Sequence, residues 1–448
     1  MGTADDCESW ATDVFGQVDL GDVRRTRRLV NVAASLARAP SGAVMASIQD
    51  PAEREGAFRF LSNEKFFVHE PGEGIAASTL RRRSELNYVA VDGASIGLAD
   101  DAHSRDIGGV GAWYKGGRGV HAITMLVADA QGVPVGILGP KWWVRTEPSL
   151  RAKFPKSRSV LSETQHVLDA LNRAEDVREA SGSRAQLWFQ LDRGFDAWPV
   201  FWLAAERDGP VRLGAPNPLA GNSGLRLPDG KKGAKLGSFT VQIPERHDRP
   251  ARTAKLSLRS ARVDLHLQVG RKRKEFVPVS AVYAVEEAYR GRDRLCWMLL
   301  TTADVRDLIS ARAVVLGYTT RWLIEELHRT WKRGWTNVER TQLRRRNSIC
   351  KWATLHHALA ARALRLTKLA RTDPELPADT EFSSEEIQAI QLLNRRSKAL
   401  LGTAPPRLGD LVFLLAELGG YDRYSKKPAG ATVIGRGLTR IASLAEGL

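Results

Sequence analysis

The hydrophobic pattern changes its period along the chain, from helical at the N-terminus to strand-like in the middle. Apolar positions recur at helical spacing through the first 70 residues, and we expect helices at Leu20–Arg38 and Ala52–Asn63. From Tyr88 the runs become short and rich in β-branched residues, with a strand at Tyr88–Leu98 and a hairpin that turns near Asp129–Gly132. The pattern therefore predicts helices followed by a sheet.

The remaining pattern alternates between helices and strands. In chain order it predicts a flexible glycine-rich loop at 105–119, a helix at Ser162–Glu179, a strand at Gln186–Leu191, a helix at Phe195–Glu206, β structure from about 210 to 302, a long helical region from Val305 into the 360s, helices near Ser383–Lys398 and Leu408–Leu418, and a final Gly-, Lys- and Pro-rich loop. This order favours an α/β protein whose central sheet has its first and fourth strands as neighbours.

The charge balance indicates a polyanionic partner. The 448 residues include 67 Lys and Arg against 51 Asp and Glu, a formal net charge of +16. Such an excess favours nucleic acid or an acidic membrane surface. No run approaches the roughly 18 apolar residues of a membrane span, and no basic helix has a wide apolar face, so we expect no membrane partner. Three widely separated cysteines and an acidic, polar start favour a reducing cytoplasm.

Part of this charge is concentrated in the first long predicted helix. Arg24, Arg25, Arg27 and Arg28 occupy little more than one helical turn. They are either a solvated basic face or a helix that follows DNA phosphates, and the charge excess of the whole chain favours DNA.

Two aspartates follow apolar runs that read as strands. Asp92 follows YVAV, and Asp192 follows LWFQL. Ligands and catalytic groups gather at the carboxyl ends of sheet strands, so both are candidate site residues. The alternative is that each aspartate only forms a turn after its strand.

A third carboxylate lies within an unusual helix face. At about 100° per residue, the side chains of Tyr318, Arg321, Glu325 and Lys332 fall within an arc of about 60°. The opposite side is apolar and is formed by Leu323, Ile324, Leu327 and Trp331. The polar face is either a salt-bridged surface or a site with one carboxylate among cationic and phenolic groups.

The chemistry of three converging carboxylates favours a divalent cation. Carboxylates held together repel one another unless a cation joins them. Oxygen-only ligands suit Mg²⁺ or Mn²⁺ rather than zinc, and two such ions can drive displacement at a phosphodiester. No G-x-x-x-x-G-K-[ST], H-E-x-x-H or Gly-x-Ser-x-Gly motif occurs, and His356-His357 is more typical of a packed helix than of a ligand pair. We therefore expect no nucleotide cofactor.

The spacing of these residues also matches a known signature. Tyr318-x2-Arg321-x3-Glu325-x6-Lys332 matches the Y-R-E-K signature of the insertion-sequence-four family of DDE transposases. LGDVRRTRRLVNVAA, EGAFRFLSN, RPARTAKLSLRSARV, CWMLLTT, YTTRWLIEELHRTWK and ELGG are similar to stretches of its composite-transposon members. The chain thus resembles these bacterial transposases over nearly its whole length.

The resemblance implies an architecture. It implies an N-terminal helical domain at 1–70 that recognises transposon ends, and a ribonuclease H-like mixed sheet within a catalytic domain at 71–368. That domain would carry an all-β insertion at about 210–302. A C-terminal helical region at 369–448 would serve in dimerisation.

The resemblance also implies roles for single residues. Asp92, Asp192 and Glu325 correspond to the catalytic metal-binding triad, which holds two Mg²⁺ ions, with Mn²⁺ able to substitute. Tyr318, Arg321 and Lys332 correspond to residues that hold phosphates near the cleavage site. Trp297 corresponds to a tryptophan that stacks on a flipped base, and Trp322 to one that lines the same region. Core packing is the alternative for Trp297.

The activity implied is cut-and-paste transposition of double-stranded DNA. A 3′-hydroxyl released at each transposon end would form a hairpin, and the reopened ends would join target DNA. Synapsis of two ends implies a homodimer on DNA in the bacterial cytoplasm, associated with the nucleoid. Two alternatives stay open on the same scaffold: a nuclease that does not transpose, and a DNA-binding regulator derived from a transposase.

Overall fold

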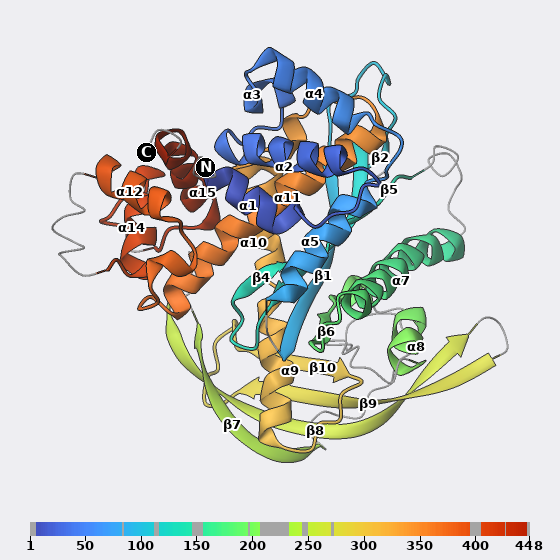
Figure 1. Ribbon diagram of the computed structural model, residues 1–448. Helices are drawn as coiled ribbons and strands as arrows, with labels where there is room; N and C mark the ends of the chain where they lie inside the picture. Colours follow the sequence, from blue (N-terminus) through green and yellow to red (C-terminus); the bar gives the residue numbers. More distant parts are fainter. Residues whose placement is uncertain are drawn as a thin grey trace.

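The computed structural model describes residues 6–82, 85–111, 116–145, 156–195, 198–206, 233–243, 250–269, 273–394, 405–425 and 427–445. The N-terminal and C-terminal helices lie together on one side of a central mixed sheet (Figure 1). A second sheet lies at the opposite end of the molecule.

The N-terminal part is helical, as predicted. Its elements are α1 (Asp6–Phe15), α2 (Val23–Arg38), α3 (Val44–Ser47), α4 (Pro51–Leu61) and α5 (His69–Arg81). Helix α2 begins where the Asp22 side chain accepts a hydrogen bond from the Arg24 N–H, and α4 begins where Asp50 accepts from the Glu53 N–H. Each capping aspartate directly precedes its helix in the sequence, and both predicted helix starts lie within a few residues of the observed ones.

The central sheet has six strands. They are β1 (Leu86–Gly97), β2 (Gly108–Gly109), β3 (Arg118–Ala128), β4 (Pro134–Ile137), β5 (Lys141–Trp143) and β6 (Gln186–Gln190). The order is β2-β3-β1-β6, with β4 and β5 also paired to β3; β1 and β6 run parallel. The predicted first and fourth strands are thus neighbours. The glycine-rich stretch at 105–119 is not simply a flexible loop, since β2 and the start of β3 pair there; residues 112–115 lie outside the described residues.

Alternate residues of β1 enter two different cores. Val89 and Val91 pack on the side covered by α7 (Lys156–Ala180) and α8 (Trp198–Glu206). Ala90 and Ala94 face the other core, which the long helix α11 (Arg346–Thr372) shares with the terminal helices. Residues two apart on a strand share a face, so Asp92 points toward the α11 side.

The second sheet is antiparallel, and its strands follow β6 and α8 in the sequence. Its strands β7 (Ala234–Ile243), β8 (Arg252–Val269), β9 (Arg273–Glu286) and β10 (Cys296–Thr301) are ordered β10-β9-β8-β7. The sheet curves around α9 (Leu308–Thr320), as Figure 1 shows in yellow and gold. Val314 and Val315 of α9 share a core with Val282 of β9 and Leu299 of β10.

The prediction of one long helix from Val305 into the 360s is wrong. The chain forms α9, then α10 (Leu323–Arg329), a π-helical turn η5 (Thr330–Gly334), a 3₁₀ turn η6 (Val338–Arg340) and finally α11. The N–H groups of Trp335 and Thr336 both donate to the Thr330 carbonyl, which widens the helix there. Asn337 then adopts a left-handed conformation, with a φ of 53°, and turns the chain.

The C-terminal part contains η7 (Ala378–Thr380), α12 (Ser384–Leu393), α14 (Leu408–Leu418) and α15 (Ala431–Ala445). Helix α15 was not predicted; the last feature predicted from the sequence was a Gly-, Lys- and Pro-rich loop. The two glycines of α15 lower its helix propensity but allow close packing. A Cβ at Gly435 would collide with the Trp335 ring, and one at Gly437 with the Leu415 carbonyl. Tertiary contacts stabilise this helix.

None of the described helices is both long enough and apolar enough to span a membrane.

Candidate active site

The parallel register of β1 and β6 places two predicted site residues level with each other. The strands pair in step, with Leu86 opposite Gln186 and Ala90 opposite Gln190. Asp92 and Asp192 are each two positions beyond this last pair. Neighbouring strands lie about 4.8 Å apart, so the two aspartates project from adjacent positions toward the same side.

The two aspartates differ in local structure, and one prediction is corrected. Asp192 lies just beyond β6, and its Oδ1 accepts a hydrogen bond from the Gly194 N–H at 2.7 Å. Asp92 does not end its strand: β1 continues to Gly97, and Asp92 pairs with Thr124 of β3. The small residues that follow Asp92 keep β1 extended against β3, whereas β6 stops. Asp92 therefore lies just beyond the part of β1 that is paired with β6.

The third carboxylate, Glu325, lies in the first turn of α10, just after the turn that separates α9 from α10. Arg321 caps α9, and its Nη2 lies 3.7 Å from Glu325 Oε1. The charge of Arg321 also acts on buried Tyr318, where it opposes the rise of the Tyr318 pKa, while the Arg321 Nε is buried without a hydrogen-bond partner. The structure thus brings Tyr318, Arg321 and Glu325 together through a turn, not along the continuous helix face that was predicted.

Electrostatic interactions join the three carboxylates. The pKa of Asp92 is raised from 3.8 to about 6, first by burial, with the charges of Asp192 and Glu325 adding to the rise. Arg321 and the Gly93 N–H oppose it. The pKa of Tyr318 is also raised, by burial and by Asp192 and Glu325. Asp192 and Glu325, from segments remote in the chain, are therefore close enough to Asp92 to affect its ionisation.

The donor set suits a hard divalent cation. Carboxylate oxygens are the ligands that Mg²⁺ and Mn²⁺ prefer. A bound cation would offset both the burial of the Asp92 carboxylate, which is the main cause of its raised pKa, and the repulsion from Asp192 and Glu325. Within the described parts of the chain, however, no three His, Cys, Asp or Glu side chains converge closely enough to form a ready-made metal site. The half-exposed Glu325 instead faces Arg321.

Lys332 approaches the same site from the π-helical turn η5. It is partly buried, and burial lowers its pKa while the charges of Glu339 and Asp92 raise it. The predicted arc of four residues on one regular helix is wrong, because η5 changes the helical period before Lys332. Its side chain nevertheless stays within electrostatic reach of Asp92.

Two predicted tryptophans lie beside this cluster. Trp297 of β10 packs edge-on against Tyr318, with ring centroids 5.6 Å apart, and is only partly buried at the margin of the second core. Trp322 is 47% exposed, and the Arg321 guanidinium lies 5.0 Å from the centroid of its ring. The two indoles therefore contact Tyr318 and Arg321, respectively.

Two polar residues that contact Asp92, His328 and Thr124, were not predicted as site residues. His328 of α10 has its Nδ1 3.7 Å from Asp92 Oδ2, and its Nε2 lies 2.7 Å from the hydroxyl of Thr124. Neither residue belongs to the quoted signature. The one available signal was that His328 follows Glu325 by three positions, which places it on the same side of a helix.

The four N-terminal arginines lie on α2 and separate into two pairs. Arg25 donates to the Leu20 carbonyl at 2.7 Å, and Arg28 forms a 2.7 Å ion pair with Glu53. Arg24 and Arg27 are exposed. The structure thus gives half of this basic cluster a role in holding the N-terminal helices together.

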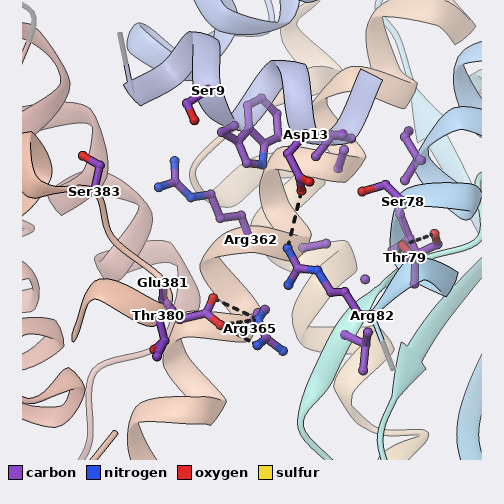
Figure 2. A pocket seen from close by; sticks show the side chains of 18 of the residues that line it. Ser9, Asp13, Ser78, Thr79, Arg82, Arg362, Arg365, Thr380, Glu381 and Ser383 are labelled. Atoms are coloured by element: carbon purple, nitrogen blue, oxygen red, sulfur yellow. Dashed lines mark hydrogen bonds and ion pairs between the residues drawn. The ribbon is translucent and has the colours of Figure 1, made fainter. Parts of the chain in front are cut away.

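A cavity of about 610 Å³ lies elsewhere, between the N-terminal and C-terminal helices. Three arginines, Arg82, Arg362 and Arg365, line it, and Figure 2 shows Arg365 beside Glu381 and Arg82 near Asp13. Arg362 pairs with Glu386 at 2.7 Å, Arg365 with Glu381, and Arg82 with Asp13 at 3.9 Å. The lining also includes Asp129, so this cavity does not present an excess of positive charge.

Comparison with known protein families concerns these N-terminal helices. Residues 7–66 match the family model described as "Transposase DNA-binding". The chain carries a transposase DNA-binding domain. This domain contains α2 with its four arginines, and it supports a role as a transposase with DNA as partner.

The transposase DNA-binding domain is attached to α11 by hydrogen bonds to its main chain. Ser348, Lys351, Trp352 and His356 lie along one side of α11, and each side chain reaches a backbone carbonyl of the domain: those of Leu61, Asn63, Gly42 and Ser41, at 3.1, 2.6, 2.8 and 2.8 Å. His356 is therefore a packed structural residue, as predicted. The domain is held in a fixed place relative to the sheet that carries Asp92.

Proposed function

We propose that this protein is a cut-and-paste DNA transposase of the insertion-sequence-four type, with Asp92, Asp192 and Glu325 as its catalytic triad. The observation that carries the proposal is the electrostatic coupling of these three carboxylates, from segments far apart in the chain, in a molecule that has a transposase DNA-binding domain. A carboxylate whose pKa is raised by burial and by neighbouring carboxylates, as that of Asp92 is, marks a functional site more often than a structural one.

The architecture supports the same proposal. We interpret the mixed sheet with Asp92 and Asp192 on neighbouring parallel strands as a ribonuclease H-like core. The antiparallel sheet β7–β10, which lies between the second and third acids, then corresponds to the all-β insertion. The helices α12, α14 and α15 would be the dimerisation region.

The triad would hold two Mg²⁺ ions, or Mn²⁺ in their place. When bound, such a pair of ions activates a water or hydroxyl and stabilises the leaving oxygen of a phosphodiester. Asp92 would contribute a carboxylate that is partly desolvated, and Glu325 one that is half exposed.

The surrounding side chains would position DNA. The charged guanidinium of Arg321 would attract a phosphate group, and Tyr318 and Lys332 lie within electrostatic reach of the same carboxylates. The partly buried Trp297 offers one ring face for a base extruded from the duplex, an interaction worth roughly 1–3 kcal/mol. The exposed Trp322 lines the approach.

The reaction we propose is a series of in-line displacements at phosphorus. Water first releases a 3′-hydroxyl at the transposon end, this hydroxyl attacks the opposite strand to form a hairpin, water reopens the hairpin, and the 3′-hydroxyl attacks target DNA. No nucleotide is consumed, because each transesterification conserves a phosphodiester bond. A homodimer would hold two ends, with each subunit cutting the end bound mainly by its partner, in the bacterial cytoplasm at the nucleoid.

The test is to incubate the purified protein and Mg²⁺ with DNA from the flanks of its own gene and with target DNA. A transposase releases 3′-hydroxyl ends, forms hairpins and joins them to the target. Cleavage without joining would identify a nuclease, and binding without cleavage a regulator. Asp176→Ala, at an exposed carboxylate on α7, is the matched control for the triad variants and should leave every step unchanged.

A further inference from the structure

The turn that joins β9 to β10 carries arginines that neither the signature nor the proposed chemistry uses. Strand β9 ends at Glu286 and β10 begins at Cys296, and we call residues 286–295 the basic turn. Its side chains Arg290 and Arg292 are exposed, whereas Arg294 is partly buried. Exposed arginines on a mobile loop would only be solvated, so the way in which this turn is held decides what they can do.

The basic turn is held in one shape by a network around Arg252 of β8. The Arg252 guanidinium donates to both carboxylate oxygens of Glu286, at 2.9 and 3.0 Å, and to Asp293 at 2.6 Å. The Tyr289 hydroxyl donates to the other Asp293 oxygen at 2.6 Å, and the centre of its ring lies 4.0 Å from Arg252 Cζ. The Leu295 N–H also donates to Glu286, at 3.0 Å. Both ends of the turn are thus fixed, which lowers the entropy cost of binding a partner there.

Each of the three acidic side chains in the basic turn already has a cationic partner. Two of them bind Arg252, and the third, Glu287, forms an ion pair with Lys255 at 3.1 Å. Arg290 and Arg292 have no ion-pair partner in the part of the chain that the structure describes. Two exposed guanidinium groups on a fixed turn, with no acid left to neutralise them, suit an external polyanion.

The basic turn leads directly into the strand that carries Trp297. Arg294 precedes Trp297 by three residues, which is at most about 10 Å of chain, and DNA rises about 3.4 Å per base pair. Trp297 in turn contacts Tyr318 of the candidate site, with ring centroids 5.6 Å apart. A duplex with one nucleotide at Trp297 would therefore pass the basic turn about three base pairs away.

We propose that Arg290 and Arg292 bind backbone phosphates of double-stranded DNA, about three base pairs from the nucleotide at Trp297. The planar guanidinium fork matches phosphate oxygens, and phosphate contacts fix the register of a protein on a duplex without reading its sequence. The basic turn would thus hold the duplex beside the carboxylates, while the transposase DNA-binding domain would select the end. The inference rests on the proposed function, because its partner is the DNA on which that function acts.

The salt dependence of DNA binding tests the contact without any cleavage. Arg290→Ala and Arg292→Ala should each reduce the salt dependence of binding to DNA from the flanks of the gene by about one counterion, measured by fluorescence anisotropy without Mg²⁺. Arg306→Ala is the matched control, because this exposed arginine lies beyond the other end of β10 and is paired with Asp304. An unchanged salt dependence in the first two variants, or an equal reduction in Arg306→Ala, would overturn the proposal. Thermal unfolding should be the same in all three variants.

Photo-cross-linking then locates the contact on the DNA. The cross-linker is attached to the exposed Cys296 or, in a second protein, to Arg292→Cys combined with Cys296→Ser. We expect both proteins to cross-link the same DNA at positions about three base pairs apart. Cross-links from Cys296 but none from Arg292→Cys would overturn the proposal. If both cross-links form as expected but the wild-type protein cleaves no DNA in Mg²⁺, the proposed function fails while the DNA contact stands.

Discussion

Two consecutive helical segments carry similar side chains and use them differently. The segment from α9 to η5 and the helix α11 both contain tryptophan, histidine and cationic residues on their buried sides. On α11, Lys351, Trp352 and His356 each reach a backbone carbonyl. On the earlier segment, Arg321 keeps an unsatisfied Nε, and Glu325 is half exposed. Side chains whose hydrogen bonds are all made indicate a structural role. A charged group without a hydrogen-bond partner, near a carboxylate whose pKa is raised, indicates a chemical role.

Removing any member of the triad should have the largest effect. Asp92→Ala, Asp192→Ala and Glu325→Ala should each abolish cleavage in Mg²⁺, because each removes ligands that the other two cannot replace. End binding, measured by gel shift, should be preserved, since the transposase DNA-binding domain is attached to α11 and not to this cluster. Cleavage that survives one of these changes would exclude that residue from the triad.

Asp92→Asn should raise stability while it removes activity. The folded pKa of Asp92, about 6, lies above its ordinary value of 3.8, so ionisation costs stability as pH rises from about 4 to 6. In metal-free protein at pH 7 this cost is about 2–3 kcal/mol, and the neutral amide avoids it. Denaturant unfolding at pH 7 and pH 4 checks this prediction.

The variant's gain in stability should be present at pH 7 and nearly vanish at pH 4, where Asp92 itself is protonated. Asp176→Asn serves as the control and should change little at either pH, since Asp176 is exposed on α7. An equal gain in stability at both pH values would mean that the gain does not come from avoiding the ionisation of Asp92.

Lys351→Met should affect DNA-end binding and stability but not the chemical step. Its ammonium donates to the Asn63 carbonyl at 2.6 Å and lies 3.6 Å from the centre of the Phe66 ring. Loss of the donor should lower the free energy of unfolding by about 1–3 kcal/mol. Lys65→Met, at an exposed lysine near the same contact, is the control. A slower single-turnover cleavage of saturated end DNA would show that the two regions are not separable.

The α2 arginines should give the smallest effects, and different ones for each pair. Arg24→Ala and Arg27→Ala should each weaken end binding and reduce its salt dependence by about one counterion, if they contact phosphates. Arg28→Ala should instead lower stability by about 0–1 kcal/mol, because it loses the partly exposed ion pair with Glu53. Identical salt dependence in all three variants would remove this distinction.

The sequence allowed prediction where local rules decide the structure. The helices predicted at Leu20–Arg38 and Ala52–Asn63 and the step from helical to strand period depend on local features, and these predictions are confirmed; the caps at Asp22 and Asp50 show why the two helices begin where they do. The break at Arg321, the π-helical turn and the helix α15 could not be predicted, because they depend on contacts with remote residues such as Gly435 against Trp335. For the site, the signature marked Glu325 but not Thr124 or His328. Thr124 lies beside Asp92 because β1 pairs with β3, and His328 because α10 packs against these two strands.

The central claim is that Asp92, Asp192 and Glu325 bind the same divalent ions, and iron-directed cleavage of the protein tests it most directly. Fe²⁺ substituted for Mg²⁺, with ascorbate and peroxide, generates radicals that cut the backbone next to the bound ion. The account predicts three clusters of cuts, near residues 92, 192 and 325, that disappear together when Mg²⁺ competes or when Asp192 is changed to alanine. Cuts at only one of these segments would contradict a shared site.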